Sequence, residues 1–339
     1  KETKAALLDL KSKGATKIIL DLRANPGGLL HEAVNICNLF VPKNEVIVTT
    51  KSKNVKHNNT YKTNYEPVDL EIPLTILVDG KSASASEIVA GALQDLDRAV
   101  IVGNRSFGKG LVQRPLNLAY GTQVKVTISR YFTPSGRCIQ ALDYARKDAN
   151  GKAIKIKQDD FNAFQTKGGR TVYDGGGILP DVIIEETKLS AVTEDLVKND
   201  AIFDFATQLY YNYLNSGLPN SITETDFNAF KQFLKQDKYN FATETSLALK
   251  KVLENAKKEK IDSGISKEYA LLQTAIEKSM NEEVIANKKE ILKLLYDELI
   301  IRFQYREGLY LNYTQNNTEI NKAKSILNNE TEYKKILKK

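Results

Sequence analysis

Short apolar runs alternate with stretches of helical periodicity over the first half of the chain. Runs typical of buried strands cover residues 17–22, 45–50, 74–78, 99–102 and 182–184. Apolar residues at helical spacing predict helices over 1–13, 29–40 and 84–95. Residues 111–118 and 122–131 alternate in character around Tyr120-Gly121, which predicts a hairpin. Repeated strand–turn–helix units of this kind indicate an α/β fold.

From about residue 193 onward, the apolar residues follow helical spacing alone. We therefore place a domain boundary between 184 and 195, with an α/β core over 1–185 and an all-helical C-terminal domain over 195–339. Residues 51–65 have the character of a loop, and 141–170 are polar and only weakly periodic. The helical part is expected to form a bundle that either caps the core or mediates self-association. Its apolar residues form two stripes: Ile202, Phe203, Ala206, Leu209, Tyr210 and Tyr213, and Ile291, Leu292, Leu295, Leu299 and Phe303.

Composition narrows the class of protein. The 339 residues carry a net charge of +7, but the lysines are scattered among glutamates, which favours a solvated surface and predicts no nucleic-acid partner. Cys37 and Cys138 are too few for a disulfide framework and are interpreted as buried free thiols. No apolar run is long enough to span a membrane. No Cys, His and carboxylate cluster has metal-ligand spacing, so we expect neither a metal nor another cofactor.

Two short segments suggest nucleophilic chemistry. Ser84 lies among small residues where a strand turns into a helix, and Lys109 lies between glycines one helix and one strand later. A serine hydroxyl needs a neighbouring base, and a desolvated lysine amine that has lost its proton can serve as one. Each segment also has a purely structural interpretation. Ser82, Ser84 and Ser86 are N-cap candidates with Glu87 closing a capping box, and Gly-Lys-Gly occurs in many hairpins.

Other polar positions complete this hypothesis. Gln113 is expected two pleats beyond Lys109 on the same strand face, where its amide could hold the lysine amine. The turn Arg23-Ala24-Asn25-Pro26-Gly27-Gly28 is either a simple turn or a source of backbone N–H groups for an oxyanion. A Ser-His-Asp triad would need His31 or His57 beside Ser84, and their positions in a helix and a polar loop disfavour it.

Five segments together resemble the C-terminal processing (tail-specific) serine peptidases. They occur in that family's order and cover about residues 1–185. The segments are DLRANPGG (21–28), SASASEIVAGALQD (82–95), FGKGLVQ (107–113), YFTPSGR (131–137) and GILPD (177–181).

The resemblance implies a role for each matching residue. Ser84 would be the nucleophile, Lys109 the general base and Gln113 the residue that orients the lysine. The backbone N–H groups of Ala85 and of a turn glycine, Gly28 before Gly27, would form the oxyanion hole. The family's fold is an α/β core related to crotonases and to Clp-type peptidases.

The resemblance also implies a biological setting, and it leaves two rivals open. We expect an endopeptidase that cleaves proteins near apolar C-terminal tails in the bacterial cell envelope, periplasmic and lipid-anchored in its full-length form. Family members carry a PDZ domain ahead of the core, and the chain is expected to be truncated without it, so that any membrane association resides in that missing part. The rivals are a non-catalytic ligand-binding or scaffolding member of the same fold and a crotonase-type acyl-CoA enzyme. Labelling of Ser84 by a fluorophosphonate, or binding of acyl-CoA, would discriminate among them.

Overall fold

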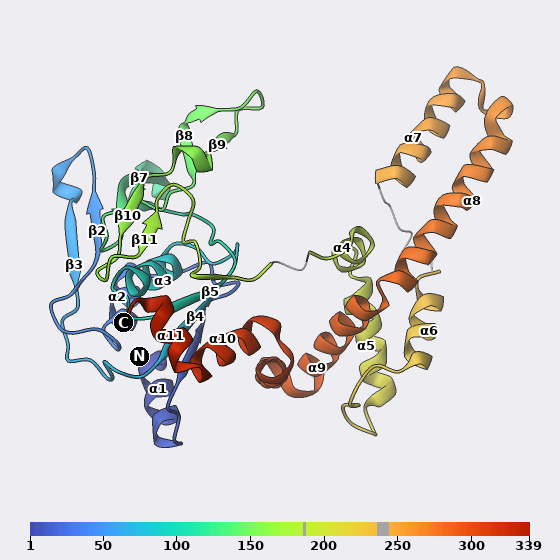
Figure 1. Ribbon diagram of the computed structural model, residues 1–339. Helices are drawn as coiled ribbons and strands as arrows, with labels where there is room; N and C mark the ends of the chain where they lie inside the picture. Colours follow the sequence, from blue (N-terminus) through green and yellow to red (C-terminus); the bar gives the residue numbers. More distant parts are fainter. Residues whose placement is uncertain (186–187, 236–243) are drawn as a thin grey trace. The chain divides into compact units, whose positions relative to one another are not determined.

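The computed structural model describes residues 1–185, 188–235 and 244–339. The chain forms two compact units: one comprises Lys1–Glu186 with Asn316–Lys339, and the other comprises Thr187–Gln315 (Figure 1). The C-terminal segment thus returns to the first unit, whereas the sequence pattern grouped all of 195–339 in one helical domain. Helical spacing identifies an apolar face but does not specify which surface that face will cover.

A parallel sheet forms the centre of the first unit. Its strands are β1 (Ile18–Asp21), β4 (Leu74–Val78), β5 (Val100–Gly103) and β12 (Val182–Ile183), in that spatial order. All three neighbouring pairs are parallel. The expected α/β architecture is confirmed, and the runs rich in Val, Ile and Leu became strands because both faces of the sheet are covered.

Helices cover the sheet on both sides (Figure 1). Ile76 and Val78 of β4 share a core with α2 (Leu30–Cys37) and α3 (Ala85–Asp95), whereas Leu77 points the other way. On that second face it packs with the apolar residues of α10 (Thr318–Asn328) and α11 (Glu330–Leu337). Helix α1 (Glu2–Ser12) contributes Leu7 to the first core. The alternation along β4 follows from the two-residue period of a strand.

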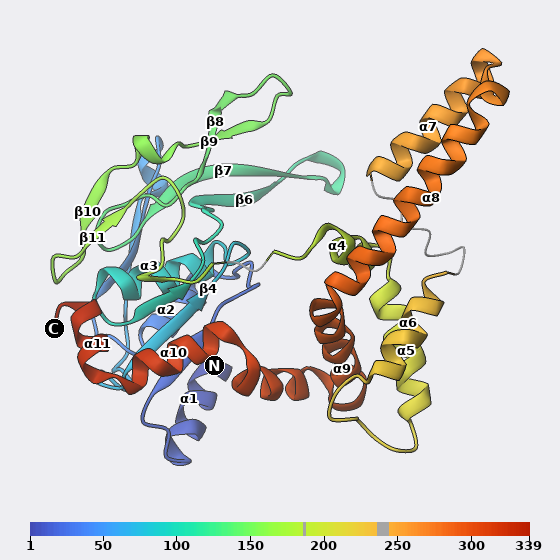
Figure 2. The same cartoon turned by 45° about the vertical axis from the view of Figure 1, so that its right-hand side comes forward.

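A second, antiparallel sheet lies beside the first. Its spatial order is β3 (Asn59–Lys62), β2 (Val46–Lys51), β7 (Gln123–Phe132) and β6 (Leu111–Asn117). Figure 2 shows β6 and β7 as a long ribbon, which confirms the expected hairpin. Its turn is the 3-10 segment η2 (Ala119–Gly121). Strand β3 and the 3-10 turn η1 (Val55–His57) were not expected, because their residues are mostly exposed and show no apolar alternation.

Two small hairpins occupy the weakly periodic region after residue 140. Strands β8 (Leu142–Lys147) and β9 (Ala153–Lys155) form the first, and β10 (Ala163–Gln165) and β11 (Thr171–Tyr173) form the second. A 3-10 turn, η3 (Gln158–Asp160), lies between them. These strands bury few side chains, so they lack the periodicity from which a strand is predicted.

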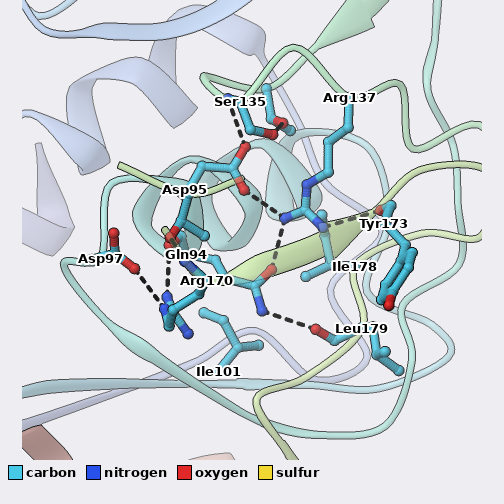
Figure 3. Close-up of polar contacts among 12 residues, drawn as sticks. Gln94, Asp95, Asp97, Ile101, Ser135, Arg137, Arg170, Tyr173, Ile178 and Leu179 are labelled. Atoms are coloured by element: carbon cyan, nitrogen blue, oxygen red, sulfur yellow. Dashed lines mark hydrogen bonds and ion pairs between the residues drawn. The ribbon is translucent and has the colours of Figure 1, made fainter. Parts of the chain in front are cut away.

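Buried ion pairs fasten the C-terminal end of α3 to later segments (Figure 3). The Arg137 guanidinium is fully buried and donates at 2.7 Å both to the Asp95 carboxylate and to the side chain of Gln94. Arg170 donates at 2.5 Å to Asp97 and at 2.5 Å to Asp181. Charges as buried as these are tolerated when they are paired and hydrogen-bonded.

The second unit consists of helices and has its own core. Phe205 and Phe230 pack with ring centroids 5.1 Å apart, and members of both expected stripes, such as Leu209 and Leu295, are buried in this core. Phe203 is the exception: its ring is exposed and lies 4.5 Å from the Arg302 guanidinium. The helices are α4 (Ala191–Lys198), α5 (Ala201–Tyr213), α6 (Glu224–Phe233), α7 (Glu244–Glu259), α8 (Asp262–Ala286) and α9 (Lys288–Asn316).

Both cysteines are free: Cys37 is buried, as expected, and Cys138 is half-buried. Burial raises the pKa of both thiols. Among the helices of the described ranges, none is long and apolar enough to cross a membrane.

Candidate active site

The candidate residues lie where three parallel strands end. Strand β1 leads into the glycine-rich turn 23–28, β4 leads into the serine turn 79–84, and β5 leads into the loop 104–110. Because β4 pairs with both β1 and β5, the three loops emerge side by side at one edge of the sheet. In parallel sheets, the loops at the carboxyl ends of the strands are the usual place for ligands.

Ser84 is the one serine of its segment that is presented at the surface of the turn. It is the N-cap of α3, half-exposed, with φ 56° and ψ −115°, a conformation unusual for a residue with a side chain. Ser82 is buried, and its hydroxyl donates to the Leu22 carbonyl at 2.7 Å. Ser86 is buried within α3. A sharp strand-to-helix turn of this kind exposes a nucleophile above a sheet.

The glycine-rich turn packs directly against the serine turn. The N–H of Ala83 donates to the Asn25 carbonyl at 3.0 Å, and the Asp79 carboxylate accepts the N–H of Ala24 at 3.0 Å. Gly27 has φ +93°, and a Cβ there would lie 2.4 Å from the Ala83 carbonyl oxygen and 2.7 Å from the Ala85 nitrogen. Only a glycine allows the two turns to approach so closely.

The backbone donors near Ser84 differ in whether they are already used. The Gly27 N–H donates to the Asn25 side chain at 2.9 Å. The N–H groups of Gly28 and Ala85 have no hydrogen-bond partner within the described part of the chain. Ala85 is the first residue of α3, where backbone N–H groups have no partner inside the helix. Of the two turn glycines, Gly28 therefore has the N–H available for a substrate oxygen.

Glu87 joins the serine turn to the lysine loop. One carboxylate oxygen accepts the backbone N–H groups of Ser84 and Lys109, each at 2.9 Å. The other oxygen accepts the Ser106 hydroxyl at 2.5 Å and the Gly108 N–H at 2.7 Å. Burial raises the pKa of this carboxyl, and the four donors partly oppose that effect. The sequence pattern indicated Glu87 only as a capping residue; the signal for a wider role was its position as the single acid in the otherwise small and apolar stretch 82–93.

Tyr131 makes a second link between the same two segments. Its hydroxyl lies 2.5 Å from the Lys109 carbonyl oxygen and 3.2 Å from the Ser84 carbonyl oxygen, both of which can accept its proton. The side chain comes from β7 and is buried, which raises the pKa of the phenol well above its ordinary value. The sequence motif 131–137 contained this tyrosine, but nothing local indicated that it faces Ser84.

The backbone of the Lys109 loop is held in place by Glu87, but among the described residues the side chains of Lys109 and Gln113 are not held by any hydrogen bond with Ser84 or with each other. Both are exposed, and in the described structure neither forms a hydrogen bond with the other or with the Ser84 hydroxyl. The expectation of a buried lysine amine is therefore not met, because the Lys109 side chain is exposed. A β-bulge between Val112 and Gln113 interrupts the alternation that placed Gln113 on the face of Lys109.

The two histidines, His31 and His57, lie outside the three loops that form the candidate site. His31 is 65% exposed in α2, and its ring is 3.4 Å from the Glu32 carboxylate. His57 ends the 3-10 turn η1. Neither ring has a hydrogen bond to Ser84 in the described structure, so the arrangement gives no support to a histidine base.

Comparison with known proteins identifies the two parts of the chain. Residues 1–146 match the model of peptidase family S41, and residues 192–327 match the C-terminal helical domain of a probable PDZ-protease. A "Carboxy-terminal-processing protease" of Bartonella bacilliformis is 44% identical over 147 residues, which are 42% of this chain and 33% of that protein. A "Probable CtpA-like serine protease" of Staphylococcus aureus is 34% identical over 212 residues, 58% of this chain and 41% of that protein.

Over residues 1–146 the chain is therefore similar to peptidase family S41, and the relatives that match this part are named as proteases. Among solved structures, the "Photosystem II D1 C-terminal processing protease" is similar, with 30% identity and a TM-score of 0.40 over 54% of this chain and 39% of that one. The chain spans about a third of the length of the Bartonella relative.

Proposed function

We propose that this protein is a serine endopeptidase with a Ser-Lys dyad, in which Ser84 is the nucleophile and Lys109 the general base. The observation that supports this best is the shared anchorage of the two residues. The Glu87 carboxylate accepts both of their N–H groups, and the Tyr131 hydroxyl contacts both of their carbonyls. Two loops that only formed a cap and a hairpin would not need a common buried anchor.

The proposed reaction follows the logic of acyl transfer. Neutral Lys109 accepts the Ser84 proton while the serine oxygen attacks the scissile carbonyl, and the lysine then gives the proton to the leaving amine. The N–H groups of Ala85 and Gly28 stabilise the oxygen that becomes negative. Water hydrolyses the resulting ester with Lys109 again as base, which releases the acid and restores the serine.

The exposure of Lys109 assigns a role to the substrate in this proposal. A peptide bound over the serine turn would cover the lysine amine and remove water from it, which favours the neutral form that a base needs. Gln113, four residues further along the chain, would then orient that amine. We further propose that it cleaves proteins near their C-terminal tails, because relatives are named for carboxy-terminal processing. The proposal extends to tails that are apolar and to proteins of the bacterial cell envelope, as the resemblance of the five sequence segments implies.

Active-site labelling tests the assignment with a matched control inside the same segment. A fluorophosphonate probe should label the wild-type protein and the Ser86→Ala variant, and should fail to label Ser84→Ala. Loss of the nucleophile should lower peptide turnover by several orders of magnitude. Equal labelling of Ser84→Ala and the wild type would refute the nucleophile. A labelled serine without turnover of any peptide would favour the non-catalytic alternative.

A further inference from the structure

A basic groove lies beside the candidate active site. It has a volume of about 930 Å³ and runs between the end of β2, the β6–β7 ribbon and the start of β8. Its lining includes the basic side chains of Lys51, Lys53, His57 and Arg130, and it includes no aspartate or glutamate. The groove is therefore a single-sign surface of the kind that attracts an oppositely charged ligand.

Two of these cations face each other across neighbouring strands. Lys51 of β2 and Arg130 of β7 are directly opposed in the antiparallel register. Like charges in such a pair are destabilising. Within the described residues, Lys51, Lys53 and Arg130 form no ion pair with a carboxylate, although Arg130 also lines a neighbouring pocket that contains Asp143, Asp160 and Asp174. The Lys51 ammonium instead lies 4.8 Å from the centre of the Phe132 ring.

The groove adjoins the proposed catalytic machinery at Gln113. Gln113 and Gln140 both contribute to its lining. The buried Gln140 side chain accepts the N–H of Gly110 at 2.8 Å, next to Lys109 in the chain. Ser84 and Lys109 are not part of the lining, so a peptide bound at Ser84 would reach this groove only if it extended past Gln113 along β6. Because Lys51 and Lys53 are exposed, they are available to such a peptide.

We propose that this groove binds an acidic segment of the protein substrate, next to the bond that is cut. The occupant is an extended stretch with several Asp or Glu side chains. The cations are spread over β2, the loop that follows it and β7, and a single terminal carboxylate could contact only one or two of them. This inference rests on the proposed peptidase function and adds a substrate preference to it. Exposed ion pairs of this kind weaken as salt screens them.

Charge reversal with matched peptides tests the proposal in the intact protein. Two peptides share one cleavage site, and the second has Asn and Gln in place of every Asp and Glu. The wild type should cleave the acidic peptide with a KM lower by about fivefold to tenfold, as two or three exposed ion pairs would produce. The double variant Lys51→Glu/Lys53→Glu should lose this preference while kcat on the neutral peptide is retained. The double variant Lys62→Glu/Lys125→Glu changes the net charge equally outside the groove and should keep the preference.

Several outcomes would overturn the proposal. They are an unchanged preference in Lys51→Glu/Lys53→Glu, an equal loss in Lys62→Glu/Lys125→Glu, or no effect of 0.5 M salt on KM. If amidation of the peptide's C-terminus, and not neutralisation of its side chains, removed the preference, the terminal carboxylate would be the ligand instead. Failure of the wild type to cleave either peptide would refute the peptidase function. Fluorescence anisotropy of the acidic peptide with Ser84→Ala would then still show whether the groove binds it.

Discussion

The Glu87 carboxylate accepts the backbone N–H of Lys109 at 2.9 Å, although the two residues belong to different segments. The same oxygen accepts the N–H of Ser84, so one buried group sets the separation of the serine turn and the lysine loop. A buried carboxylate is costly unless donors surround it, and this one has four. Its position explains why Glu87 is fully buried in the first turn of α3.

Replacement of Glu87 should damage both stability and labelling. Glu87→Ala leaves four donors without their acceptor and should destabilise the core by more than about 3 kcal/mol, since each buried unsatisfied group costs about 1–3 kcal/mol. Glu87→Gln keeps one acceptor oxygen but turns an NH₂ group toward two donors. Its losses of stability and of labelling rate should therefore lie between those of the wild type and Glu87→Ala. Urea denaturation and the rate of fluorophosphonate labelling measure the two effects. Wild-type stability and labelling in both variants would contradict the anchoring role.

Lys109→Arg should be inactive even though it keeps the charge. A guanidinium remains protonated at any working pH and cannot accept the serine proton. Lys109→Ala should be equally inactive, while Lys81→Arg, an exposed lysine of the serine turn, should leave peptide turnover within about twofold of the wild type. Turnover of a peptide substrate is the measurement, with circular dichroism to verify folding. An active Lys109→Arg enzyme would show that this residue is not the base.

Replacement by alanine should strongly destabilise the fold at Gly27 and have little effect at Gly28. Gly27→Ala places a Cβ 2.4 Å from the Ala83 carbonyl oxygen at a φ of +93°, so it should cost several kcal/mol and displace the serine turn. Gly28→Ala meets no atom within 4 Å and keeps its N–H, so stability and labelling should change little. Thermal unfolding and fluorophosphonate labelling distinguish the two variants. A stable, fully labelled Gly27→Ala would show that the close approach is unnecessary.

The buried pair of Arg137 and Asp95 should behave non-additively. Arg137→Met leaves the Asp95 carboxylate buried without its cation, which typically costs about 3–5 kcal/mol. Adding Asp95→Asn removes the unpaired charge and should recover part of that loss. The free energies of unfolding of the two single variants and the double variant form the test. If the double variant lost the sum of the two single losses, the charge pairing would not be the cause.

The ionised carboxylate of Asp69 should stabilise the fold at every pH except the strongly acidic range in which it becomes protonated. Burial alone would raise its pKa, but hydrogen bonds from Lys11 and from the backbone of Ile72 and Glu71 lower the pKa from 3.8 to about 2. Because the folded value is the lower one, the contribution is present above pH 3.8 and disappears as the pH falls through about 2. Asp69→Asn should therefore lose about 1 kcal/mol at pH 7, after allowance for solvent screening, and almost nothing at pH 2.

The exposed pair of Asp9 and Lys13 provides the control for this pH dependence. Asp9 is 56% exposed, so Asp9→Asn should change the free energy of unfolding by less than about 0.5 kcal/mol at either pH. Urea denaturation between pH 2 and pH 7 measures both variants. A constant deficit of Asp69→Asn across this range would mean that ionisation of Asp69 is not what stabilises the fold.

Local pattern alone determined the framework that carries the site. The runs that became β1, β4 and β5 are short, apolar and bounded by turns, and Ser84 stands where a strand meets the helical spacing of α3. Such signals are local because a covered strand and an amphipathic helix each require a particular residue period within a few positions. The same pattern placed Ser84 and Lys109 one helix and one strand apart, which the parallel pairing of β4 and β5 turns into proximity of their loops.

Only the tertiary structure decided which groups meet. Hydrogen bonds join Glu87 to Lys109, which is 22 positions away, and Tyr131 to Ser84, which is 47 positions away. Another joins Leu74 to Tyr333, 259 positions away. No local period encodes such pairs, because they depend on how strands are ordered in the sheet and on which surface a helix covers. For the same reason, the return of α10 and α11 to the core and the gathering of Lys51 and Arg130 in one groove were invisible in the sequence.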